Sequence, residues 1–299
     1  MSTKKFDTFI LGHVSLDCNI YQGQERRSFG GAVVYSSHAA VAGGWKVGVL
    51  TKTSEEDKKE LPHIFNVAPE NLYYVASSKT TSIRNEYLTE DKERRICTAL
   101  RVADPFRKED IPQVEASIYH LGGLIAGDFE PDLLPYLSEK GKLAVDVQAF
   151  LRHNQQGSMV FQDWEDKKKY LPLIHFLKTD AAEAEIMTGE NNREKAARML
   201  FEWGAKEVMI THNSEVLVYD GNRYYTAPLK PRNLSGRTGR GDTCFSAYIT
   251  ERLKEPIDKA IRYGAALVSM KMEKPEPFKG SREDVEYYVS SYYNKPSGV

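Results

Sequence analysis

The chain has 299 residues, of which 41% are apolar, 11% aromatic and 28% charged. This composition excludes an intrinsically disordered chain and is typical of a protein with one large core. The 41 Lys and Arg residues are balanced by 42 Asp and Glu residues, which leaves a formal charge of −1. No overall basic field therefore favours nucleic acid or an anionic membrane as a partner.

The lack of a recognisable targeting signal and the spacing of the cysteines predict an ordinary cytoplasmic protein. No apolar run reaches the roughly 20 residues that cross a bilayer, and the N-terminus lacks the apolar core and cleavage site of a signal peptide. The cysteines Cys18, Cys97 and Cys244 contain no CxxC pair. This pattern argues against a disulfide framework and against a zinc site.

Short β-branched or aromatic runs alternate with longer amphipathic stretches, a pattern typical of βαβ units around a mostly parallel sheet. The predicted strands cover 6–12, 45–51, 117–122, 143–147, 174–178 and 206–211. The predicted helices cover 32–42, 131–140, 180–187, 193–203, 242–253, 257–272 and 282–293. No repeat or linker divides the chain. We therefore expect one α/β domain over residues 1–299, with a doubly wound sheet and helices on both faces.

Two segments, 16–28 and 81–99, are too polar for central parallel strands, and the second contains a turn at residues 89–91. We expect them to form a small β lid that projects from the main sheet and through which two copies of the chain could form a homodimer. An ordinary surface hairpin is the alternative. A lid would matter because its closure excludes water from a reacting centre.

The strongest local motif is Arg237-Thr238-Gly239-Arg240-Gly241-Asp242-Thr243, which leads directly into a predicted helix. Glycines let the backbone turn tightly, and a helix N-terminus presents unpaired N–H groups, so a phosphate could lie against residues 239–242. Asp242 could then act as a base toward a hydroxyl beside that phosphate. From these residues alone, a glycine-rich loop in which Asp242 only caps its helix remains an alternative.

Taken with the rest of the chain, this motif resembles that of the ribokinase/PfkB family of carbohydrate kinases, and the resemblance covers nearly the whole length. The family's Asp-Thr-x-Gly-Ala-Gly-Asp motif corresponds to residues 236–242. The resemblance implies that Gly239 and Gly241 form an anion hole and that Asp242 is the catalytic base. Gly236 replaces the first Asp of the motif, and Arg240 replaces the alanine. Arg240 makes the implied site unusually basic, and it either contacts phosphate or is a solvated side chain.

The resemblance also implies a substrate site. Gly30-Gly31 is similar to the family's di-glycine motif, and Asp17 matches an acid that holds substrate hydroxyls. Tyr35 stands where relatives carry an asparagine, which disfavours ribose. Residues 146–152 resemble an Asp-x-Asn-x-x-Arg segment, and Asn85 and Arg94 could reach the substrate from the lid or be exposed polar residues. The implied substrate residues are Asp17, Gly30, Gly31, Tyr35, Asn85, Gln148 and Arg152.

On the donor side, residues 178–183 resemble the family's Asn-x-x-Glu motif near magnesium and phosphate, with Asp180 in place of Asn. Asp180 and Glu183 would contact Mg²⁺ through water, or form a capping box, or do both. Thr211 ends a strand that lies along the nucleotide in relatives, while His212 is a loop residue. Ser269 belongs to the helix that flanks adenine. The implied nucleotide residues are Lys178, Asp180, Thr211, Thr238 and Ser269.

The sequence therefore predicts a kinase that uses ATP and Mg²⁺ to phosphorylate a small polyol, either a sugar or a cyclitol such as an inositol. The chain has no GxxxxGK[ST], HExxH or helix-opening GxGxxG motif, so a P-loop kinase, a zinc hydrolase and a dinucleotide dehydrogenase lack their central signals. Two alternatives remain: a nucleoside kinase of the same fold, and a non-catalytic regulator that binds sugar.

Overall fold

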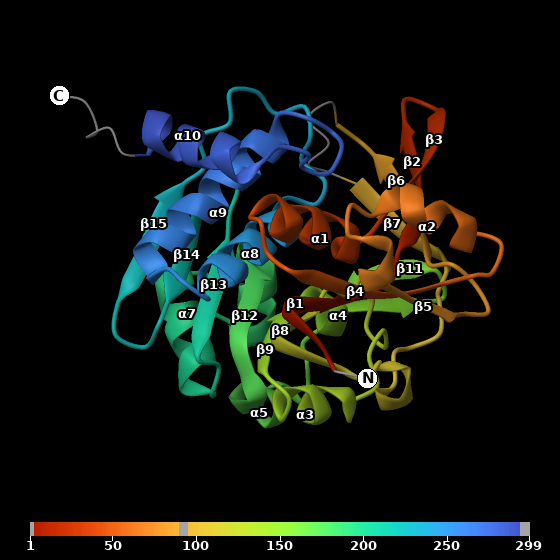
Figure 1. Cartoon of the computed structure of the whole chain (residues 1–299), viewed down its shortest axis with the longest axis horizontal. Helices are drawn as coiled ribbons and strands as arrows, with labels where there is room; N and C mark the ends of the chain where they lie inside the picture. The colour runs from red at the N-terminus through yellow and green to blue at the C-terminus, as the bar shows by residue number, and fades with distance from the viewer. Residues whose placement is uncertain (1–2, 90–94, 294–299) are drawn as a thin grey trace.

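The computed structural model describes residues 3–89 and 95–293. Its centre is a nine-stranded sheet in the order β15-β14-β13-β12-β9-β8-β1-β4-β5 (Figure 1). Neighbouring strands from β13 to β5 in this order are parallel, while β14 and β15 form an antiparallel edge. The strands are β1 (Lys4–Leu11), β4 (Val47–Thr53), β5 (Leu72–Ala76), β8 (Val114–Leu121), β9 (Lys142–Asp146), β12 (Ile174–Asp180), β13 (Glu207–Thr211), β14 (Glu215–Tyr219) and β15 (Tyr224–Pro228).

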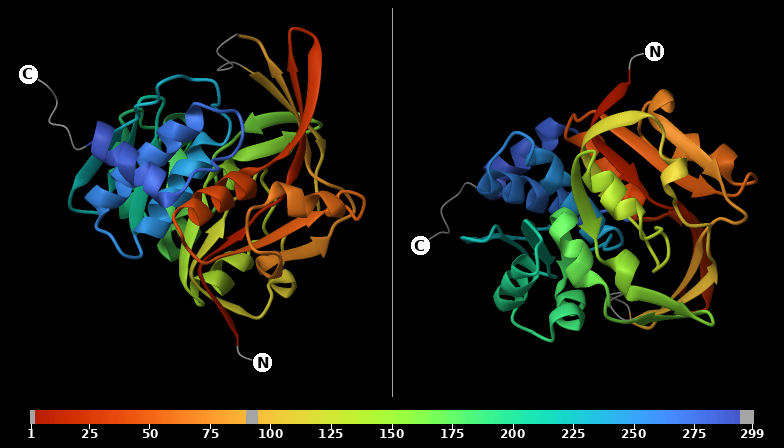
Figure 2. Two further views of the ribbon diagram at one scale, coloured as in Figure 1. Left: turned by 45° about the horizontal axis from the view of Figure 1, so that its top comes forward. Right: turned by 90° about the horizontal axis from the view of Figure 1, so that it is seen from below.

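Helices cover both faces of this sheet, which confirms the predicted doubly wound fold (Figures 1 and 2). One layer contains α1 (Ala32–Ala42), α8 (Arg240–Glu251) and α9 (Ile257–Met272), with α10 (Arg282–Tyr292) packed against α9. The other contains α3 (Leu133–Ser138), α5 (Lys167–Tyr170), α6 (Ala181–Thr188) and α7 (Arg193–Glu202). Apolar runs in the central strands are buried on both sides because each face meets a helix layer.

Shorter helical pieces connect these elements. They are α2 (Leu61–Ile64) and α4 (Gln148–Leu151), with 3₁₀ turns at Lys58–Glu60, Pro69–Asn71, Lys108–Asp110 and Leu171–Leu173. Helix α4 follows β9 directly, so it lies at the carboxyl end of a central strand. In open α/β sheets, ligands bind at this end of the strands.

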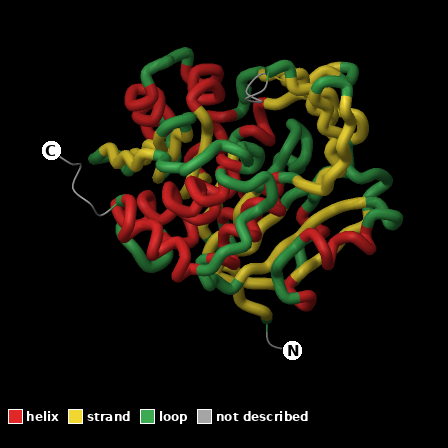
Figure 3. Tube along the Cα trace, turned by 90° about the horizontal axis from the view of Figure 1, so that it is seen from above, coloured by secondary structure: helices red, strands yellow, loops and turns green. Residues whose placement is uncertain are grey.

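The lid is a second sheet of six strands in the order β10-β11-β7-β6-β2-β3, and it projects from the main layer (Figures 2 and 3). Its strands are β2 (Ser15–Tyr21), β3 (Gln24–Gly30), β6 (Ser82–Tyr87), β7 (Arg95–Arg101), β10 (Arg152–Gln155) and β11 (Ser158–Phe161). The predicted lid is therefore present, but it is larger than expected. A homodimer through it stays a prediction.

Most differences from the predicted elements occur at polar or edge strands. The prediction missed β5, β10, β11, β14 and β15 as separate strands, and it missed the one-turn helices α2, α4 and α5. Among them, β5, β10 and β15 lie at sheet edges, whereas β14 is buried between β13 and β15. The predicted turn at residues 89–91 lies partly outside the described residues. Among the described residues, no helix has the length and apolar character needed to span a membrane.

Candidate functional site

The glycine motif forms the N-terminus of α8. Gly239 precedes the helix with φ +74°, a left-handed conformation that favours glycine. Arg240 begins the helix, so Gly241 and Asp242 occupy its first turn, where amide groups have no intrahelical acceptor. The helix dipole adds partial positive charge at this end. This geometry suits an anion beside residues 239–242.

A buried ion pair lies beside these amides. Lys178, at the end of β12, donates from Nζ to Asp146 Oδ2 at 2.8 Å, and both side chains are buried. A Cβ atom on Gly241 would lie 3.0 Å from Lys178 Nζ, which places the ammonium against the glycine of the anion hole. Burial opposes the charge of Lys178, but Asp146 and then Glu183 outweigh it and raise its pKa. Lys178 is therefore a permanent cation at the predicted phosphate site.

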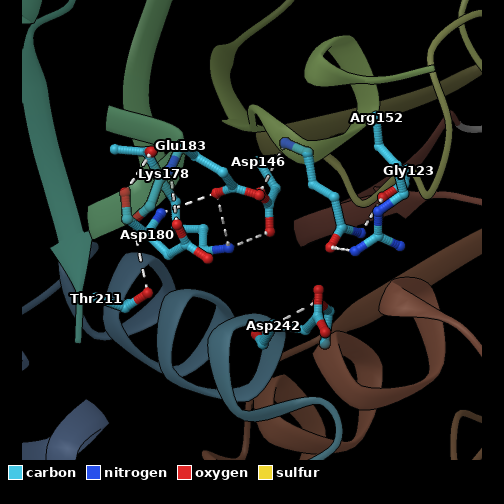
Figure 4. Close-up of polar contacts among 11 residues, drawn as sticks. Gly123, Asp146, Arg152, Lys178, Asp180, Glu183, Thr211 and Asp242 are labelled. Atoms are coloured by element: carbon cyan, nitrogen blue, oxygen red, sulfur yellow. Dashed lines mark hydrogen bonds and ion pairs between the residues drawn. The ribbon is translucent and has the colours of Figure 1, made fainter. Parts of the chain in front are cut away.

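Asp242 faces this pair across the site (Figure 4). Burial raises the pKa of Asp242 to about 6; the negative charge of Asp146 adds to this rise, and the charge of Lys178 opposes it. A carboxyl group with this pKa is ionised at neutral pH and is a stronger base than an ordinary aspartate. These are the properties that a general base needs to accept a proton from a hydroxyl near pH 7.

Asp180 and Glu183 form the capping box of α6. Asp180 Oδ1 accepts from the Glu183 amide at 2.8 Å, and Glu183 Oε2 accepts from the Asp180 amide at 2.8 Å. Glu183 is buried 3.9 Å from Lys178 Nζ, and burial raises its pKa to about 7. Its carboxylate is thus already occupied, whereas Asp180 is partly exposed at the strand end. The capping-box alternative is confirmed, and Asp180 is the better placed of the two toward a solvated metal.

No group of three or more His, Cys, Asp or Glu side chains is arranged to hold a metal within residues 3–89 and 95–293. A magnesium ion normally keeps several waters and is bound through one or two carboxylates together with phosphate oxygens of the substrate. The residues present fit that mode, with Asp180 as a protein carboxylate.

Gln148 and Arg152 extend the site from α4 toward the lid. Arg152 donates to Gln148 Oε1 at 2.6 Å, and Gln148 Nε2 donates to the Gly123 carbonyl at 3.4 Å. In Figure 4 Arg152 lies on the same side as Asp146 and opposite Asp242. The positive charge of Arg152 also contributes a small lowering of the Asp242 pKa. The structure thus places Arg152 near Asp242 and pairs Gln148 with Arg152.

Asp17, Gly30 and Tyr35 form the next part of the site. A Cβ on Gly30 would lie 3.4 Å from Asp17 Oδ2, so the carboxylate lies against the di-glycine turn. Burial raises the pKa of the Tyr35 hydroxyl, and the negative charges of Asp17 and Asp242 raise it further. Tyr35 therefore lies near both carboxylates. Gly31 precedes α1, the helix that carries Tyr35.

Asn85 is buried within the lid and bonds to a neighbour that the sequence did not single out. Its Nδ2 donates to Asn19 Oδ1 at 3.2 Å, and its Oδ1 accepts from Cys97 Sγ at 3.4 Å. Asn19 follows Asp17 by two residues on β2, so both side chains lie on one face of the strand. This alternation was the signal that could have identified Asn19. Arg94 lies outside the described residues.

Two further side chains, Tyr35 and Lys271, contact the glycine motif that forms the predicted anion hole. A Cβ on Gly239 would lie 2.2 Å from the Tyr35 ring, so this ring packs directly on the glycine. The buried Lys271 donates to the Gly236 carbonyl at 2.9 Å, and burial lowers its pKa to about 8. A Cβ on Gly236 would lie 1.7 Å from the Lys274 carbonyl oxygen, which explains why no aspartate stands at this position. No local sequence pattern indicated that Lys271 contacts the Gly236 carbonyl.

The remaining predicted donor residues differ in their surroundings. Arg240 has a buried Nη1 atom without a hydrogen-bond partner in the described part of the chain, and burial and the nearby Arg237 lower its pKa. Thr211 is buried and donates to the Thr179 carbonyl at 3.5 Å, whereas Thr238 is exposed. His212 lies in an exposed loop beside Ser214, as expected.

Ser269 is fully buried and hydrogen-bonded within the protein. It donates to the Ala265 carbonyl at 2.6 Å, accepts from the Lys230 amide at 2.9 Å, and lies 3.1 Å from the Tyr293 hydroxyl. A hydroxyl can donate once and accept twice. The Ser269 hydroxyl thus donates its proton within α9, and one of its acceptor positions is taken by the segment after β15.

The family model for pfkB family carbohydrate kinases matches residues 66–281. The chain belongs to this family. Among solved structures, a pyrophosphate-dependent kinase in the ribokinase family, complexed with a pyrophosphate analogue and myo-inositol, is 36% identical, with a TM-score of 0.85 and coverage of 94% of this chain and 99% of that one.

Two further relatives belong to this comparison. A structure on the conversion of a pyrophosphate-dependent myo-inositol-1 kinase into a myo-inositol-3 kinase is 35% identical, with a TM-score of 0.84 and coverage of 96% of this chain and 99% of that one. A cytidine kinase from Thermococcus kodakarensis is 27% identical, covering 86% of this chain and 93% of its own. The pfkB family membership predicted from the glycine motif is thus confirmed.

If Asp242 is the base of this pfkB kinase, Asp242→Asn should retain the fold and lose roughly 10²- to 10⁴-fold in kcat, because the amide cannot accept the proton. Steady-state kinetics and circular dichroism measure the two properties. Asp258→Asn is the matched control, since Asp258 also lies in the first turn of a helix, α9. A variant at residue 242 that keeps more than about a tenth of the wild-type kcat would contradict the assignment.

The pH dependence should report the charges around Asp242. Activity should fall as the pH falls through about 6, because protonated Asp242 cannot act as a base. Asp146→Asn removes a charge that raises the Asp242 pKa, so the acidic limb should move to lower pH. Lys178→Met removes a charge that lowers it, so the limb should move to higher pH. Profiles of kcat/KM for the two variants test this, and shifts in the same direction would refute it.

Proposed function

We propose that the chain transfers a phosphoryl group from pyrophosphate to a hydroxyl of a cyclitol, of which myo-inositol is the leading candidate. The main support is the cationic anion hole formed by Lys178, Arg240 and the α8 N-terminus, together with the likeness to pyrophosphate-dependent inositol kinases at 36% identity. This proposal replaces ATP, the donor expected from the sequence, with pyrophosphate.

The charge at the donor site supports a donor that consists only of phosphate groups. Arg240 stands where the family motif has alanine, and its buried Nη1 has no partner in residues 3–89 and 95–293. Burial lowers the pKa of Arg240, the nearby Arg237 adds to this lowering, and Asp180 opposes it. An anionic ligand would give the buried guanidinium an acceptor for charge-assisted hydrogen bonds.

The surroundings of Ser269 support the same donor. A nucleotide needs space for its base, which the sequence placed along α9. Here Tyr293 and the Lys230 amide contact the Ser269 hydroxyl from the side of α10 and of the segment after β15. Pyrophosphate has no base, so it does not need this space.

In the proposed reaction, the substrate hydroxyl lies between Asp242 and the anion hole. Its proton passes to the Asp242 carboxylate as its oxygen forms a bond to phosphorus. The bridging bond of pyrophosphate breaks, and orthophosphate leaves. The amides of Gly241 and Asp242 and the Lys178 ammonium stabilise charge on the transferred group. Bound Mg²⁺ would supply further positive charge to the two phosphate groups, with Asp180 beside its hydration shell.

The polyol would be held by Asp17, Gln148 and Arg152, with Asn19 and Asn85 above it on the lid. Carboxylate, amide and guanidinium groups together both accept from and donate to ring hydroxyls. Tyr35 fills the place of an asparagine and narrows the site beside Gly239. A ring that carries a hydroxyl on every carbon satisfies more of these groups than ribose does.

The likeness to a cytidine kinase supports a second candidate, a nucleoside kinase with the same base. Cytidine is therefore included in every substrate panel. A non-catalytic regulator has less support, because such a protein does not need a buried base whose pKa is raised to about 6.

Pyrophosphate should support turnover of myo-inositol at a higher kcat/KM than ATP. Arg240→Ala should raise the KM for pyrophosphate by roughly tenfold or more, which corresponds to the loss of one charge-assisted hydrogen bond, and should leave the KM for the polyol nearly unchanged. Phosphorylated product is measured by ³¹P NMR, with Arg198→Ala as an exposed control. Turnover of cytidine with ATP that exceeds turnover of every cyclitol with pyrophosphate would overturn the proposal.

Asp17→Ala should raise the KM for the polyol by roughly five- to hundredfold, because substrate hydroxyls then lose a charged acceptor. The KM for pyrophosphate should change far less. Glu25→Gln is a matched control, since Glu25 lies on the neighbouring strand β3 and is exposed. An effect of Asp17→Ala confined to the donor would place the polyol elsewhere.

A further inference from the structure

Two adjoining hollows lie on the opposite side of α4 from the proposed substrate site. Their volumes are about 350 Å³ and 440 Å³, and they share Phe150, His153, Trp164 and Asp166 in their walls. The first is also lined by residues of α3 and of the loop after β8. The second opens along the segment between β11 and α5. None of these wall residues takes part in the proposed phosphoryl transfer.

The wall of the first hollow contains four aromatic side chains, Phe129, Phe150, Trp164 and Tyr170. Phe150 stacks on Trp164 with a centroid distance of 4.2 Å, and Trp164 stacks on Tyr170 at 5.7 Å with an interplanar angle of 8°. Leu134 and Ala149 complete an apolar floor. A hollow with such walls favours a ligand with a flat, apolar body.

The polar groups of the wall select the charge of the ligand. Every Asp, Glu, Lys or Arg side chain among the wall residues is a carboxylate, at Glu130, Asp163, Glu165 and Asp166. Lys167 pairs with Asp163, and the Arg107 guanidinium lies 3.8 Å from Glu130. The excess of negative charge is therefore concentrated at Glu165 and Asp166. His153 Nε2 is buried and has no hydrogen-bond partner among the described residues. A ligand amine would meet carboxylates here, and a ligand carboxylate would be repelled.

We propose that this double hollow, defined by Phe150, His153, Trp164 and Asp166, is an effector site for a small organic cation with an aromatic or similarly flat apolar body. The body packs against Phe150 and Trp164, and the ammonium group faces Glu165 and Asp166. The site is separate from the catalytic centre and does not depend on the identity of the phosphate donor.

The hollow is connected to the polyol site through α4. This helix has a single turn, Gln148–Leu151, and it carries Ala149 and Phe150 on the hollow and Gln148 on the substrate side. The Arg152 carbonyl accepts from the Ala126 amide at 2.8 Å, which joins the loop beside the hollow to the residue that holds Gln148. A ligand packed on Phe150 would stabilise α4 in the position where Gln148 and Arg152 are paired. Binding should therefore increase the affinity for the polyol.

Phenethylamine tests the site, with 3-phenylpropionate and benzyl alcohol as anionic and neutral probes of similar size. Isothermal titration of the full chain should give one phenethylamine site with a Kd of about 1 mM or tighter, at least about fivefold tighter than either other probe. The double variant Glu165→Gln/Asp166→Asn should reduce this preference to less than about twofold, as expected when the charge attraction is removed. Glu139→Gln, an exposed residue just after α3, is the control.

The coupling is measured on the same protein. Saturating phenethylamine should lower the KM for myo-inositol by about threefold and leave the KM for pyrophosphate unchanged, and myo-inositol should tighten phenethylamine binding by the same factor. Absent binding, equal binding of the anionic probe, or an unchanged preference in the double variant would overturn the site. A polyol KM that rises or stays constant would overturn the coupling. The titration needs no turnover, so it remains decisive if the proposed reaction fails.

Discussion

The buried ion pair between Lys178 and Asp146 is the interaction on which the rest of the site depends. Without Lys178, the carboxylates of Asp146, Glu183 and Asp242 would share one dry pocket, and their mutual repulsion would force protonation. With Lys178, the opposing effects of Asp146 and Lys178 on Asp242 partly cancel, and burial leaves its pKa at about 6. A buried pair is weak evidence for stability, because its desolvation cost can exceed its attraction. Here its consequence concerns the proposed reaction: Asp242, the proposed base, is ionised near neutral pH, and a cation lies against the proposed anion hole.

The fold produces this pair through strand register. Strands β9 and β12 are parallel neighbours, and Asp146 and Lys178 are register partners at their carboxyl ends. The order of the sheet reverses beside β1, since the chain goes from β1 to β4 on one side and from β8 to β9 on the other. Open α/β sheets bind ligands at such a point. The α8 N-terminus and Tyr35 of α1 cover the site from the helix layer that contains both helices. Groups from β9, β12, α1 and α8, which are distant in sequence, therefore meet without long loops.

The parts of the site that follow from local sequence could be predicted, and the parts that depend on long-range pairing could not. The glycine motif predicted the α8 N-terminus and Asp242 because tight turns and helix starts need particular residues within a few positions. Lys271 carries no such signal, since its role depends on the packing of α9 under residue 236. Asn19 has only the alternation with Asp17 along β2, and its contact with Asn85 depends on the register of the lid. Strands β10 and β11 were missed for the same reason, because these short strands are defined by long-range pairing of β11 with β7 and of β10 with β11. The pattern of Asp180 and Glu183 was consistent with either a cap or a metal contact, and geometry confirmed the cap.

The proposed preference for pyrophosphate depends on two features of this chain, the contacts around Ser269 and the presence of Arg240. A nucleotide gains affinity from its base and ribose, whereas pyrophosphate offers only phosphate oxygens. The contacts of Tyr293 and Lys230 with Ser269 hold the C-terminal end of α10 and the segment after β15 against α9. In the proposal they leave less room for a base, which alone would weaken any donor that needs that room. Arg240 adds a cation on the phosphate side, where one charge-assisted hydrogen bond contributes about 1.5–3 kcal/mol. Either feature alone would give a poor enzyme for pyrophosphate. With the contacts around Ser269 but without Arg240, the site would bind every donor weakly. With Arg240 but without those contacts, the site would still favour the larger nucleotide donor. The two segments, α10 with its Tyr293 and the first turn of α8, are therefore expected to determine donor choice together.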